Sequence, residues 1–306
     1  MIAGVVGLGR MGSAIAQRMV QAGITVWGYD IDDLARQKAA ELGVQVADKL
    51  ADIAREARVI MIMVPAGEQT ERVIDDLRAH LKAGDVIIDG GNSNFHDSIR
   101  RARTLKECGI IFLDCGVSGG LQGRARGFCL MVGGDDVAYQ KAHQVFAAIA
   151  APGAVAHVGT SGAGHYVKMV HNGIEYALLE AYGEGFHLLK DGFFKDESLD
   201  LEEISRIWNT SALIRSLLLE LAHKIFVRDQ ELHHVSGEIA EGGTGRWTVE
   251  EAEDSDIPVP AIKASLEMRQ WSRVTGGNYG TKVIAMLRQQ FGGHSVKKAD
   301  NVDEDN

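Results

Sequence analysis

The sequence predicts an α/β fold in which a doubly wound, mostly parallel sheet is followed by an all-helical C-terminal domain. Two observations support this prediction. Over the first half of the 306 residues, short apolar runs alternate with amphipathic stretches, which is typical of βαβ units. After Gly159 only helical periodicity remains. We therefore expect a boundary between two domains near Gly159.

The expected elements follow the apolar pattern along the chain. Seven apolar runs predict the strands Ile2–Val6, Thr25–Tyr29, Val59–Val64, Val86–Ile88, Ile110–Leu113, Cys129–Val132 and Ala154–Val158. Amphipathic stretches between them predict helices, for example Met11–Ala22, Leu34–Leu42 and Glu68–His80. The helices expected in the second half are Gly164–Leu189, Leu201–Thr210, Leu213–Ile225, Thr248–Asp254, Ala261–Val274 and Gly280–Gln290. Residues 291–306 form a tail whose polar, charged end, Val296–Asn306, we expect to be disordered.

The composition excludes several classes of protein. Hydrophobic residues make up 45% and charged residues 24%, as in globular proteins, so a disordered or fibrous chain is excluded. The net charge of −10 argues against a nucleic-acid partner, which would require a basic surface. No apolar stretch reaches the ~18–20 residues that a membrane helix needs. The three cysteines lack metal-ligand spacing and the apolar start lacks a basic leader, so we expect a cytoplasmic protein with no membrane partner.

A glycine-rich turn follows the first expected strand. Its sequence, Gly7-Leu8-Gly9-Arg10-Met11-Gly12, matches G-x-G-x-x-G, in which the glycines allow a tight turn and a close approach to pyrophosphate. The next helix would direct free N–H groups at the phosphates. We therefore expect a Rossmann-type dinucleotide-binding domain over residues 1–158, the alternative being a glycine-rich turn without a ligand. The expected cofactor-binding residues are Gly7, Leu8, Gly9, Arg10, Met11, Gly12, Asp30, Val64, Pro65, Ala66 and Asn92.

Asp30 indicates which dinucleotide is bound. It ends the second expected strand, where a carboxylate can accept hydrogen bonds from the adenosine ribose hydroxyls. The same carboxylate would repel the 2′-phosphate of NADP, and no arginine directly follows it, so NAD is favoured over NADP. Alternatively, Asp30 caps the next helix, a role that Asp32 could also fill.

A polar stripe runs along the first long helix of the second half. Lys168, His171, Asn172, Glu175 and Tyr176 are spaced so that they project from one face, and apolar residues flank them. Burial would depress the pKa of a lysine and raise that of a glutamate, as a base and an acid working near neutral pH require. The alternative is an ordinary charge pair on a wet surface.

Three further glycine-rich loops are candidate ligand sites. Asp89–Ser93 and Gly116–Gly120 each follow an expected strand, and open α/β sheets bind ligands at the carboxyl ends of their strands. Asn92 and Ser118 could hold hydroxyls or a carboxylate, although the first loop could equally cap the next helix. The third loop, Gly242–Trp247, precedes a helix and could bind an anion or be a capped turn.

Together these motifs resemble the short form of the decarboxylating 6-phosphogluconate dehydrogenase family. The matching segments span most of the chain: Gly7–Gly12, Asp89–Ser93, Gly116–Gly120, Gly164–Tyr176 and Gly243–Thr248. The run Lys-Met-Val-His-Asn-Gly-Ile-Glu-Tyr from residue 168 is the most specific. Related β-hydroxyacid dehydrogenases share the fingerprint, the Ser-Gly-Gly loop and a helical lysine, but they lack this run and the Asp-Gly-Gly-Asn-Ser segment.

The resemblance implies a role for each matching residue. Lys168 would be the general base and Glu175 the general acid in the NAD-dependent oxidation of 6-phosphogluconate to ribulose 5-phosphate and CO2. Tyr176, Thr244 and Arg269 would reach the 6-phosphate. The implied substrate-binding residues are Asn92, Ser118, Gly119, Gly120, His171, Asn172, Tyr176, Thr244, Arg269, Arg288 and His294.

The resemblance also implies an assembly. In the family, the tail that corresponds to Arg288 and His294 enters the site of the partner subunit. Residues 159–290 would then form a helical substrate and dimerisation domain, and the chain would form a homodimer or a tetramer made of dimers.

Three features depart from the common long form of the family. The long form has a lysine at the position of Gly242, so phosphate recognition here would depend more on Arg269, Arg288 and Arg246. The helical part is much shorter, which suggests the loss of a helical repeat. The long form is typically NADP-dependent and carries Asn-Arg-Thr where Asp30-Ile31-Asp32 stands here, which favours NAD.

The resulting hypothesis is a three-step reaction. A neutral Lys168 takes the proton of the 3-hydroxyl as hydride leaves C3, and the 3-keto acid then loses CO2 while protonated Lys168 stabilises the oxyanion. Glu175 finally protonates C1 of the enediol. No metal is needed, because the substrate makes its own electron sink. One alternative is a non-decarboxylating β-hydroxyacid dehydrogenase, from which Glu175 and the phosphate-binding arginines would distinguish this protein. The other is a non-catalytic NAD-binding sensor, which would not need Lys168 and Glu175 on one face of a helix.

Overall fold

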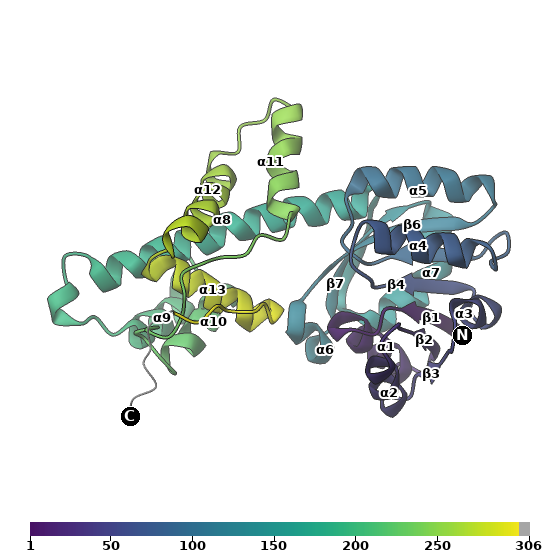
Figure 1. Ribbon diagram of the computed structural model, residues 1–306, viewed down its shortest axis with the longest axis horizontal. Coiled ribbons are helices and arrows are strands. Elements are labelled where there is room, and N and C mark those ends of the chain that lie inside the picture. The colour runs from purple at the N-terminus through teal and green to yellow at the C-terminus, as the bar shows by residue number, and fades with distance from the viewer. Residues whose placement is uncertain (300–306) are drawn as a thin grey trace. The chain divides into compact units, whose positions relative to one another are not determined.

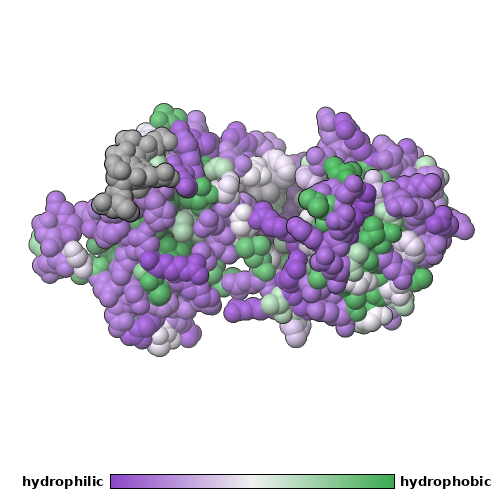
Figure 2. All heavy atoms as spheres, turned by 60° about the horizontal axis from the view of Figure 1, so that its bottom comes forward, coloured by the Kyte–Doolittle hydropathy of each residue, from purple (hydrophilic) through white to green (hydrophobic). Residues whose placement is uncertain are grey.

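The computed structural model describes residues 1–299 and contains two compact units, one from Met1 to Met169 and one from Val170 onward (Figure 1). The first unit is α/β and the second is helical, so the predicted fold class is confirmed. The face shown in Figure 2 is mostly hydrophilic, with apolar residues in separate patches. Among residues 1–299, none of the helices combines the length and the apolar character that crossing a bilayer would require.

A single eight-stranded sheet forms the centre of the first unit. Across the sheet the strand order is β3-β2-β1-β4-β5-β6-β7-β8, and neighbouring strands are parallel except for β6 and β7. The order reverses beside β1, and in such sheets the ligand crevice lies at this point. The strands are β1 (Ile2–Val6), β2 (Thr25–Tyr29), β3 (Gln45–Val46), β4 (Val59–Ile62), β5 (Val86–Asp89), β6 (Ile111–Ser118), β7 (Phe128–Gly134) and β8 (Ala150–Gly159).

Helices cover both faces of this sheet (Figure 1). They are α1 (Arg10–Gln21), α2 (Asp33–Glu41), α3 (Leu50–Glu56), α4 (Glu68–Arg78), α5 (Phe95–Glu107), α6 (Gly123–Arg126) and α7 (Asp136–Ile149). Val59 and Met61 of β4 pack into one apolar core with α1 and α7, whereas Ile60 and Ile62 pack into another with α3, α4 and α5. Because both faces are buried, the central strands read as continuous apolar runs in the sequence.

The bounds of β4, β5, β7 and β8 are shifted by one to four residues from the sequence-based expectation, and two further strands differ more. β3 is not predicted, because its two residues, Gln45 and Val46, form no apolar run. β6 continues past the expected end at Leu113 as far as Ser118, because its second half pairs antiparallel with β7. The prediction that Gly116–Gly120 is a loop is therefore wrong for its first three residues, and the chain leaves the sheet only at Gly119.

The second unit contains most of the longest helix, α8 (Ala163–Asp191), which begins in the first unit. The other helices are α9 (Leu201–Ser211), α10 (Leu217–Phe226), α11 (Thr244–Asp254), α12 (Pro260–Thr275) and α13 (Tyr279–Gly292). Leu179 and Phe186 of α8 pack with α10 and α13 in a separate apolar core. α10 begins later than the expected Leu213, because the Ser216 hydroxyl accepts a hydrogen bond from the Leu219 amide (3.0 Å) and caps the helix there.

The described part of the tail lies along an earlier segment of the same unit. The Ser236 amide donates to the Lys297 carbonyl (2.8 Å), and the Ala299 amide donates to the His234 carbonyl (3.1 Å). Val235 and Lys298 form an isolated antiparallel bridge. The disorder expected from Val296 onward is therefore wrong for residues 296–299, and the rest of that expectation, residues 300–306, lies outside the described residues.

Candidate active site

The phosphate-binding turn connects β1 to α1. Gly7 has a φ of 91°, and a Cβ on Gly12 would overlap the Gly7 carbonyl oxygen, so these positions require glycine. Gly9 faces open space, and α1 begins after it without a side-chain cap. The first N–H groups of α1 are therefore available to an anion, and the turn fits the pyrophosphate of a dinucleotide.

Asp30 is linked directly to this turn. Its Oδ2 accepts a hydrogen bond from the Leu8 amide (2.6 Å), and its Oδ1 accepts one from the Asp32 amide (2.9 Å). The alternative in which Asp30 caps α2 is wrong, because Asp32 is the cap and accepts from the Leu34 amide (2.9 Å). The role of Asp30 in ribose binding stays a prediction.

Sequence reasoning missed Arg36, which lies next to Asp30. Its Nη1 donates to the Asp30 carbonyl (2.6 Å), and its other terminal nitrogen pairs with Asp33. The guanidinium also lies 5.9 Å from the ring centre of Tyr29. The signal was weak, because an arginine three residues after an aspartate on a helix is an ordinary surface pair.

The ends of β4 and β5 carry the next predicted residues. Val64 packs against the apolar core, while Pro65 and Ala66 are exposed. Asn92 has a φ of 55° and exchanges two hydrogen bonds with the backbone of Val117: the Val117 amide donates to its Oδ1 (3.0 Å), and its Nδ2 donates to the Val117 carbonyl (3.3 Å). Asn92 therefore ties the Asp89–Ser93 loop to β6. The alternative that this loop caps α5 is wrong, because Asn94 is the cap.

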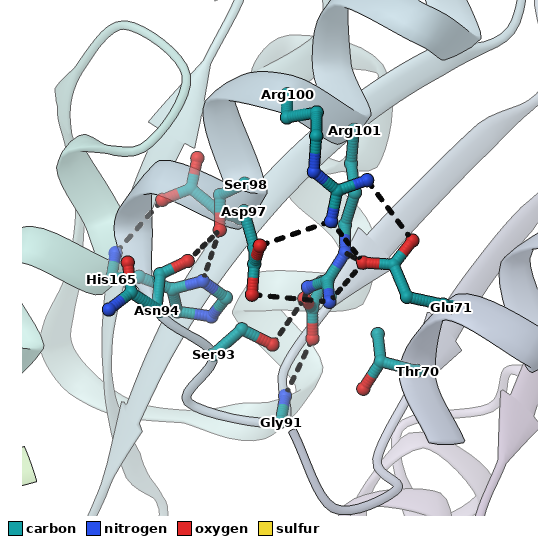
Figure 3. A network of polar contacts seen from close by, with 12 residues as sticks. Thr70, Glu71, Gly91, Ser93, Asn94, Asp97, Ser98, Arg100, Arg101 and His165 are labelled. Atoms are coloured by element: carbon teal, nitrogen blue, oxygen red, sulfur yellow. Dashed lines mark hydrogen bonds and ion pairs between the residues drawn. The ribbon is translucent and has the colours of Figure 1, made fainter. Parts of the chain in front are cut away.

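A buried charge network that the sequence did not predict lies beneath this loop (Figure 3). Arg101 of α5 pairs with Asp89 (2.8 Å) and with Glu71 of α4 (2.8 Å), and its side chain is 1% exposed. Arg100 also pairs with Glu71 (2.5 Å), so the pKa of the Glu71 carboxyl is lowered by these two arginines against the opposing effect of burial. In the sequence, Arg101 is one of several cations on an amphipathic helix, so the pattern does not indicate that it is buried or paired.

The start of α8 is fixed by a buried acid on β6. The carboxylate of Asp114 accepts hydrogen bonds from the amides of Gly162 (2.7 Å) and His165 (2.9 Å), which places a negative charge at the positive end of the helix. His165 in turn contacts the Ser98 hydroxyl through Nδ1 (2.7 Å). The direction in which α8 leaves the sheet is therefore set by hydrogen bonds to a rigid strand.

Lys168 lies one turn further along α8 and is 7% exposed. A Cβ on Gly116 of β6 would overlap the Cβ of Lys168, so the absence of a side chain on Gly116 lets the helix approach the strand this closely. Glu175 follows two turns later on the same helix and is half-buried. The alternative of a fully solvated charge pair is therefore wrong for Lys168, while the catalytic roles of both residues stay predictions.

Ser118, Gly119 and Gly120 lie at the end of β6 and the start of the short 3-10 turn Gly120–Gln122. Ser118 is half-buried and Gly119 is exposed. These positions agree with a ligand-binding role at the carboxyl end of a strand, which stays a prediction.

In the second unit, two buried arginines lie close to Tyr176. The guanidinium carbon of Arg269 lies 3.3 Å from the centre of the Tyr176 ring, and Arg269 is 1% exposed. Among residues 1–299, its Nη1 and Nη2 have no hydrogen-bond partner. Burial, with the charge of Arg288 adding to it, lowers the pKa of Arg269 to about 10, and burial also lowers the pKa of Arg288. Because buried cations need a counter-charge, this cluster fits an anion.

The start of α11 lies beside the same stripe of α8, and the expected loop Gly242–Trp247 is wrong from Thr244 onward, because α11 begins there. Asn172 Nδ2 donates to the Thr244 hydroxyl (3.3 Å), and His171 Nδ1 contacts Asn172 Oδ1 (3.1 Å). Gly243 precedes α11 with a φ of 85° and no side-chain cap, so the alternative of a loop capped by its own side chain is wrong. His171, Asn172, Tyr176, Thr244 and Arg269 are therefore brought together in the second unit, and their roles in substrate binding stay predictions.

Sequence reasoning missed Glu180 on this stripe. It lies one turn after Tyr176 and is buried, and burial together with the nearby Glu184 raises the pKa of its carboxyl to about 7 against the opposing charge of Arg269. The spacing from Tyr176 would have included it, since the position four residues further on lies on the same face.

Arg246 and His294 lie at the edge of the predicted set. Arg246 is exposed and forms two hydrogen bonds of 3.0 Å with Glu241, which occupy its guanidinium. His294 is exposed just after α13, and its ring centre lies 6.1 Å from that of Phe291. The implied role of the tail in a partner's site stays a prediction. Within residues 1–299, no cluster of three or more histidine, cysteine or acidic side chains could hold a metal ion.

The Rossmann sheet, the open phosphate turn and the long helix with its buried lysine define a dinucleotide-dependent oxidoreductase. The model for the NAD-binding domain of 6-phosphogluconate dehydrogenase matches residues 3–160, and the model for the C-terminal domain of that enzyme matches residues 164–304. The chain therefore belongs to the 6-phosphogluconate dehydrogenase family.

Individual proteins agree with this assignment. The NAD(+)-dependent, decarboxylating 6-phosphogluconate dehydrogenase of Haloferax volcanii is 45% identical over 97% of this chain and 99% of its own length. The 6-phosphogluconate dehydrogenase structure from Plasmodium falciparum has a TM-score of 0.81 at 27% identity, covering 95% of this chain and 64% of that one. The 3-hydroxyisobutyrate dehydrogenase structure from Mycobacterium tuberculosis has a TM-score of 0.74 at 22% identity over 94% of this chain and 99% of that one, a likeness of fold alone.

Proposed function

We propose that the protein catalyses the oxidative decarboxylation of 6-phosphogluconate to ribulose 5-phosphate and CO2, with NAD as the oxidant. The observation that carries this proposal is the set of groups on α8. That helix bears the buried amine of Lys168, the carboxyl of Glu175 two turns later and Tyr176, whose ring lies against the buried Arg269. A base, an acid and part of an anion site thus belong to one helix. The name of the Haloferax volcanii relative describes the same reaction.

Lys168 is the general base in this proposal. Its neutral amine takes the proton of the 3-hydroxyl, and bound NAD supplies the hydride acceptor for C3. The 3-keto acid that forms loses CO2, because the new carbonyl accepts the electron pair of the breaking bond, and protonated Lys168 then stabilises the oxyanion. The close contact of Lys168 Cβ with Gly116 and the capping of α8 by Asp114 hold the base of this side chain against the sheet.

Glu175 is the general acid. After CO2 leaves, its carboxyl protonates C1 of the enediol to give ribulose 5-phosphate. A dehydrogenase that oxidised without decarboxylation would have no use for this proton donor, so Glu175 supports the decarboxylating reaction over the non-decarboxylating alternative.

The phosphate of the substrate is held by the arginine cluster. Arg269 and Arg288 are buried cations, and Arg269 has two terminal nitrogens without hydrogen-bond partners among residues 1–299. A phosphate dianion would supply the missing acceptors and the missing counter-charge. Thr244, at the uncapped start of α11, would add a hydroxyl and a helix N-terminus. Gly242 provides no lysine, so these groups carry the recognition.

NAD is the proposed cofactor. The Asp30 carboxylate beside the phosphate turn would accept hydrogen bonds from the ribose hydroxyls and would repel a 2′-phosphate. Arg36 is the nearby cation that could offset this repulsion, but the Asp30 carbonyl and the Asp33 carboxylate already engage it.

A homodimer or a tetramer is the proposed assembly. Ile174, Leu178 and Leu188 of α8 are large apolar side chains that are exposed in the single chain. Such exposed apolar residues on a long helix are typical of a surface that another subunit covers. His294, which is exposed just after α13, is the tail residue that would complete the neighbouring site, whereas Arg288 lies beside Tyr176 of its own chain.

The proposed reaction is tested by the absorbance of reduced nicotinamide with 6-phosphogluconate, using NAD and NADP in parallel. We expect faster turnover with NAD. Equal rates with both cofactors would contradict the role of Asp30, and no reduction of either cofactor would contradict the proposed reaction. Binding of NAD without turnover on any sugar acid would instead favour the alternative of a non-catalytic NAD-binding sensor.

A further inference from the structure

Asp89, the last residue of β5, holds the residues on both sides of Asn92. Its Oδ1 accepts a hydrogen bond from the Gly91 amide (3.0 Å), and its Oδ2 accepts one from the Ser93 hydroxyl (2.8 Å). Asn92 between them adopts a left-handed conformation that few residues other than glycine occupy. The position of the Asn92 amide therefore depends on the placement of the Asp89 carboxylate.

That carboxylate is fully buried, and Arg101 is its counter-charge. Arg101 Nη1 donates to Asp89 Oδ2 (2.8 Å), while the other side of the guanidinium faces Glu71, which accepts from Arg101 Nε (2.9 Å). Figure 3 shows the Arg101 guanidinium beside Glu71, with Gly91 and Ser93 close to it. Since Arg101 is 1% exposed, it presents no surface to a ligand.

The contact with Glu71 extends the network to a second loop. Glu71 lies in the first turn of α4, where the Thr70 hydroxyl donates to the Pro65 carbonyl (3.0 Å) and so holds the Val64–Gly67 turn. A Cβ on Gly91 would lie 2.6 Å from the Val64 carbonyl oxygen, so the two loops are in direct contact. Arg101 therefore joins the loops that follow two adjacent parallel strands, β4 and β5.

These loops lie on one side of the phosphate turn. In the order β2-β1-β4-β5, Asp30 and the adenosine end belong to the β2 side, so the other half of a dinucleotide extends across β1 toward β4 and β5. The nicotinamide end and the substrate would then meet the two loops that Arg101 joins.

We propose that Arg101 is a positioning residue: by bridging Asp89 and Glu71 it fixes Asn92 and the Val64–Gly67 turn relative to each other, and so sets the geometry in which nicotinamide and substrate react. This inference rests on the proposed function. A buried ion pair is a weak source of net stability compared with an apolar replacement, so stability alone does not account for it. Its geometric effect is direct, because small displacements of reacting groups cost much of the rate.

The test compares two ion pairs at opposite ends of β5. Arg101→Met removes the cation at the carboxyl end, and Arg58→Met removes the cation that pairs with the buried Asp85 (2.8 Å) just before the strand, away from the loops. The double variant Arg101→Met/Asp89→Asn removes both charges, so that it folds even if the single variant does not. Arg101→Lys keeps the charge but not the planar fork.

Melting temperature, kcat and KM are measured for each variant of the full-length protein. We expect kcat/KM for 6-phosphogluconate to fall about 100-fold in Arg101→Met and in the double variant, mostly through kcat. Arg101→Lys should recover part of this loss, and Arg58→Met should stay close to wild type. Wild-type kcat/KM in the folded double variant, or an equal loss in Arg58→Met, would overturn the proposal.

A binding measurement separates this inference from the proposed reaction. NADH and ADP-ribose, which lacks the nicotinamide, are titrated into wild type and variants by calorimetry. We expect the Arg101 variants to lose about tenfold in NADH affinity and nothing in ADP-ribose affinity, because ordering a loop costs on this scale. Unchanged NADH affinity, or parallel losses for both ligands, would overturn the positioning role, whether or not 6-phosphogluconate proves to be the substrate.

Discussion

The two units treat their buried charges differently. In the first unit, Asp89 and Asp114 are fully buried, and each is matched by a cation or by backbone amides of the same unit. In the second unit, Arg269 and Arg288 are buried beside Tyr176, and among residues 1–299 neither forms an ion pair with a carboxylate. The buried aspartates of the first unit fix the backbone around them. The buried arginines of the second unit lack a carboxylate partner among the described residues.

This difference indicates where a ligand supplies something the protein lacks. A buried charge that is already paired contributes geometry, whereas an unpaired one destabilises the free protein until a counter-ion arrives. We therefore expect variants of the first kind to lose stability and variants of the second kind to lose affinity.

The largest expected effect concerns Lys168, where the first unit presents a buried amine. In Lys168→Ala, kcat should fall about 1000-fold, which is within the range for loss of a general base. NADH binding should remain, because the phosphate turn is untouched. Lys190→Ala removes a half-buried lysine from the far end of the same helix, where it pairs with Glu231, and should leave kcat unchanged. Near-normal turnover in Lys168→Ala would contradict the assigned role.

Arg269→Met is the most direct test of the difference between the buried charges of the two units. KM for 6-phosphogluconate should rise about 100-fold, the order of one charge-assisted pair with phosphate, while the melting temperature of the free protein stays level or rises. Arg101→Met, in contrast, should lower stability by about 3–5 kcal/mol, because it leaves Asp89 without a counter-charge. Millimolar inorganic phosphate should raise the melting temperature of wild type but not of Arg269→Met. An equal drop in melting temperature for both variants would remove the distinction.

Asp30→Asn sharpens the prediction for the cofactor. The amide oxygen can still accept a hydrogen bond, but the negative charge is gone, so kcat/KM with NADP relative to NAD should rise about tenfold. Asp33→Asn, which neutralises a neighbouring acid on α2, is the matched control and should change the ratio less. Steady-state rates with both cofactors measure this ratio, and an unchanged ratio in Asp30→Asn would contradict the role of its charge.

The smallest effect concerns the stability of the second unit. Burial raises the pKa of Glu180 from its ordinary 4.5 to about 7, so the folded state binds this proton more tightly than the unfolded state does. The free energy of unfolding should therefore fall as the pH rises through this window. Glu180→Gln should be more stable than wild type by about 2 kcal/mol above that window and similar below it. Melting curves across the window check this, with Glu250→Gln as an exposed control.

Much of the fold can be predicted from local patterns in the sequence. β1 and β2 have the bounds that their apolar runs predict, because strands buried on both faces are uniformly apolar. β6 is longer than its apolar run, because Asp114 and Gly116 are buried by the antiparallel partner and by α8, neither of which a local pattern reveals. Likewise β3 is too short to leave a signal.

The site divides in the same way. The helical stripe is visible in the sequence because helix periodicity alone places Lys168 and Glu175 on one face, and the same rule would have found Glu180. Arg101 could not be found, since its partners Asp89 and Glu71 lie on other elements and become neighbours only through the stacking of α4 and α5 on the sheet.

The most direct measurement is the ratio of CO2 released to NADH formed when the protein acts on 6-phosphogluconate, with gluconate as the matched substrate that lacks the phosphate. The account is that the buried arginines bind the substrate phosphate, that Lys168 acts in the oxidation and the loss of CO2, and that Glu175 protonates the enediol. It predicts that one CO2 is released for each NADH formed and that gluconate reacts far more slowly. Formation of NADH without release of CO2 would contradict the decarboxylating reaction, and equal rates with gluconate and 6-phosphogluconate would contradict the phosphate-binding role of the arginines.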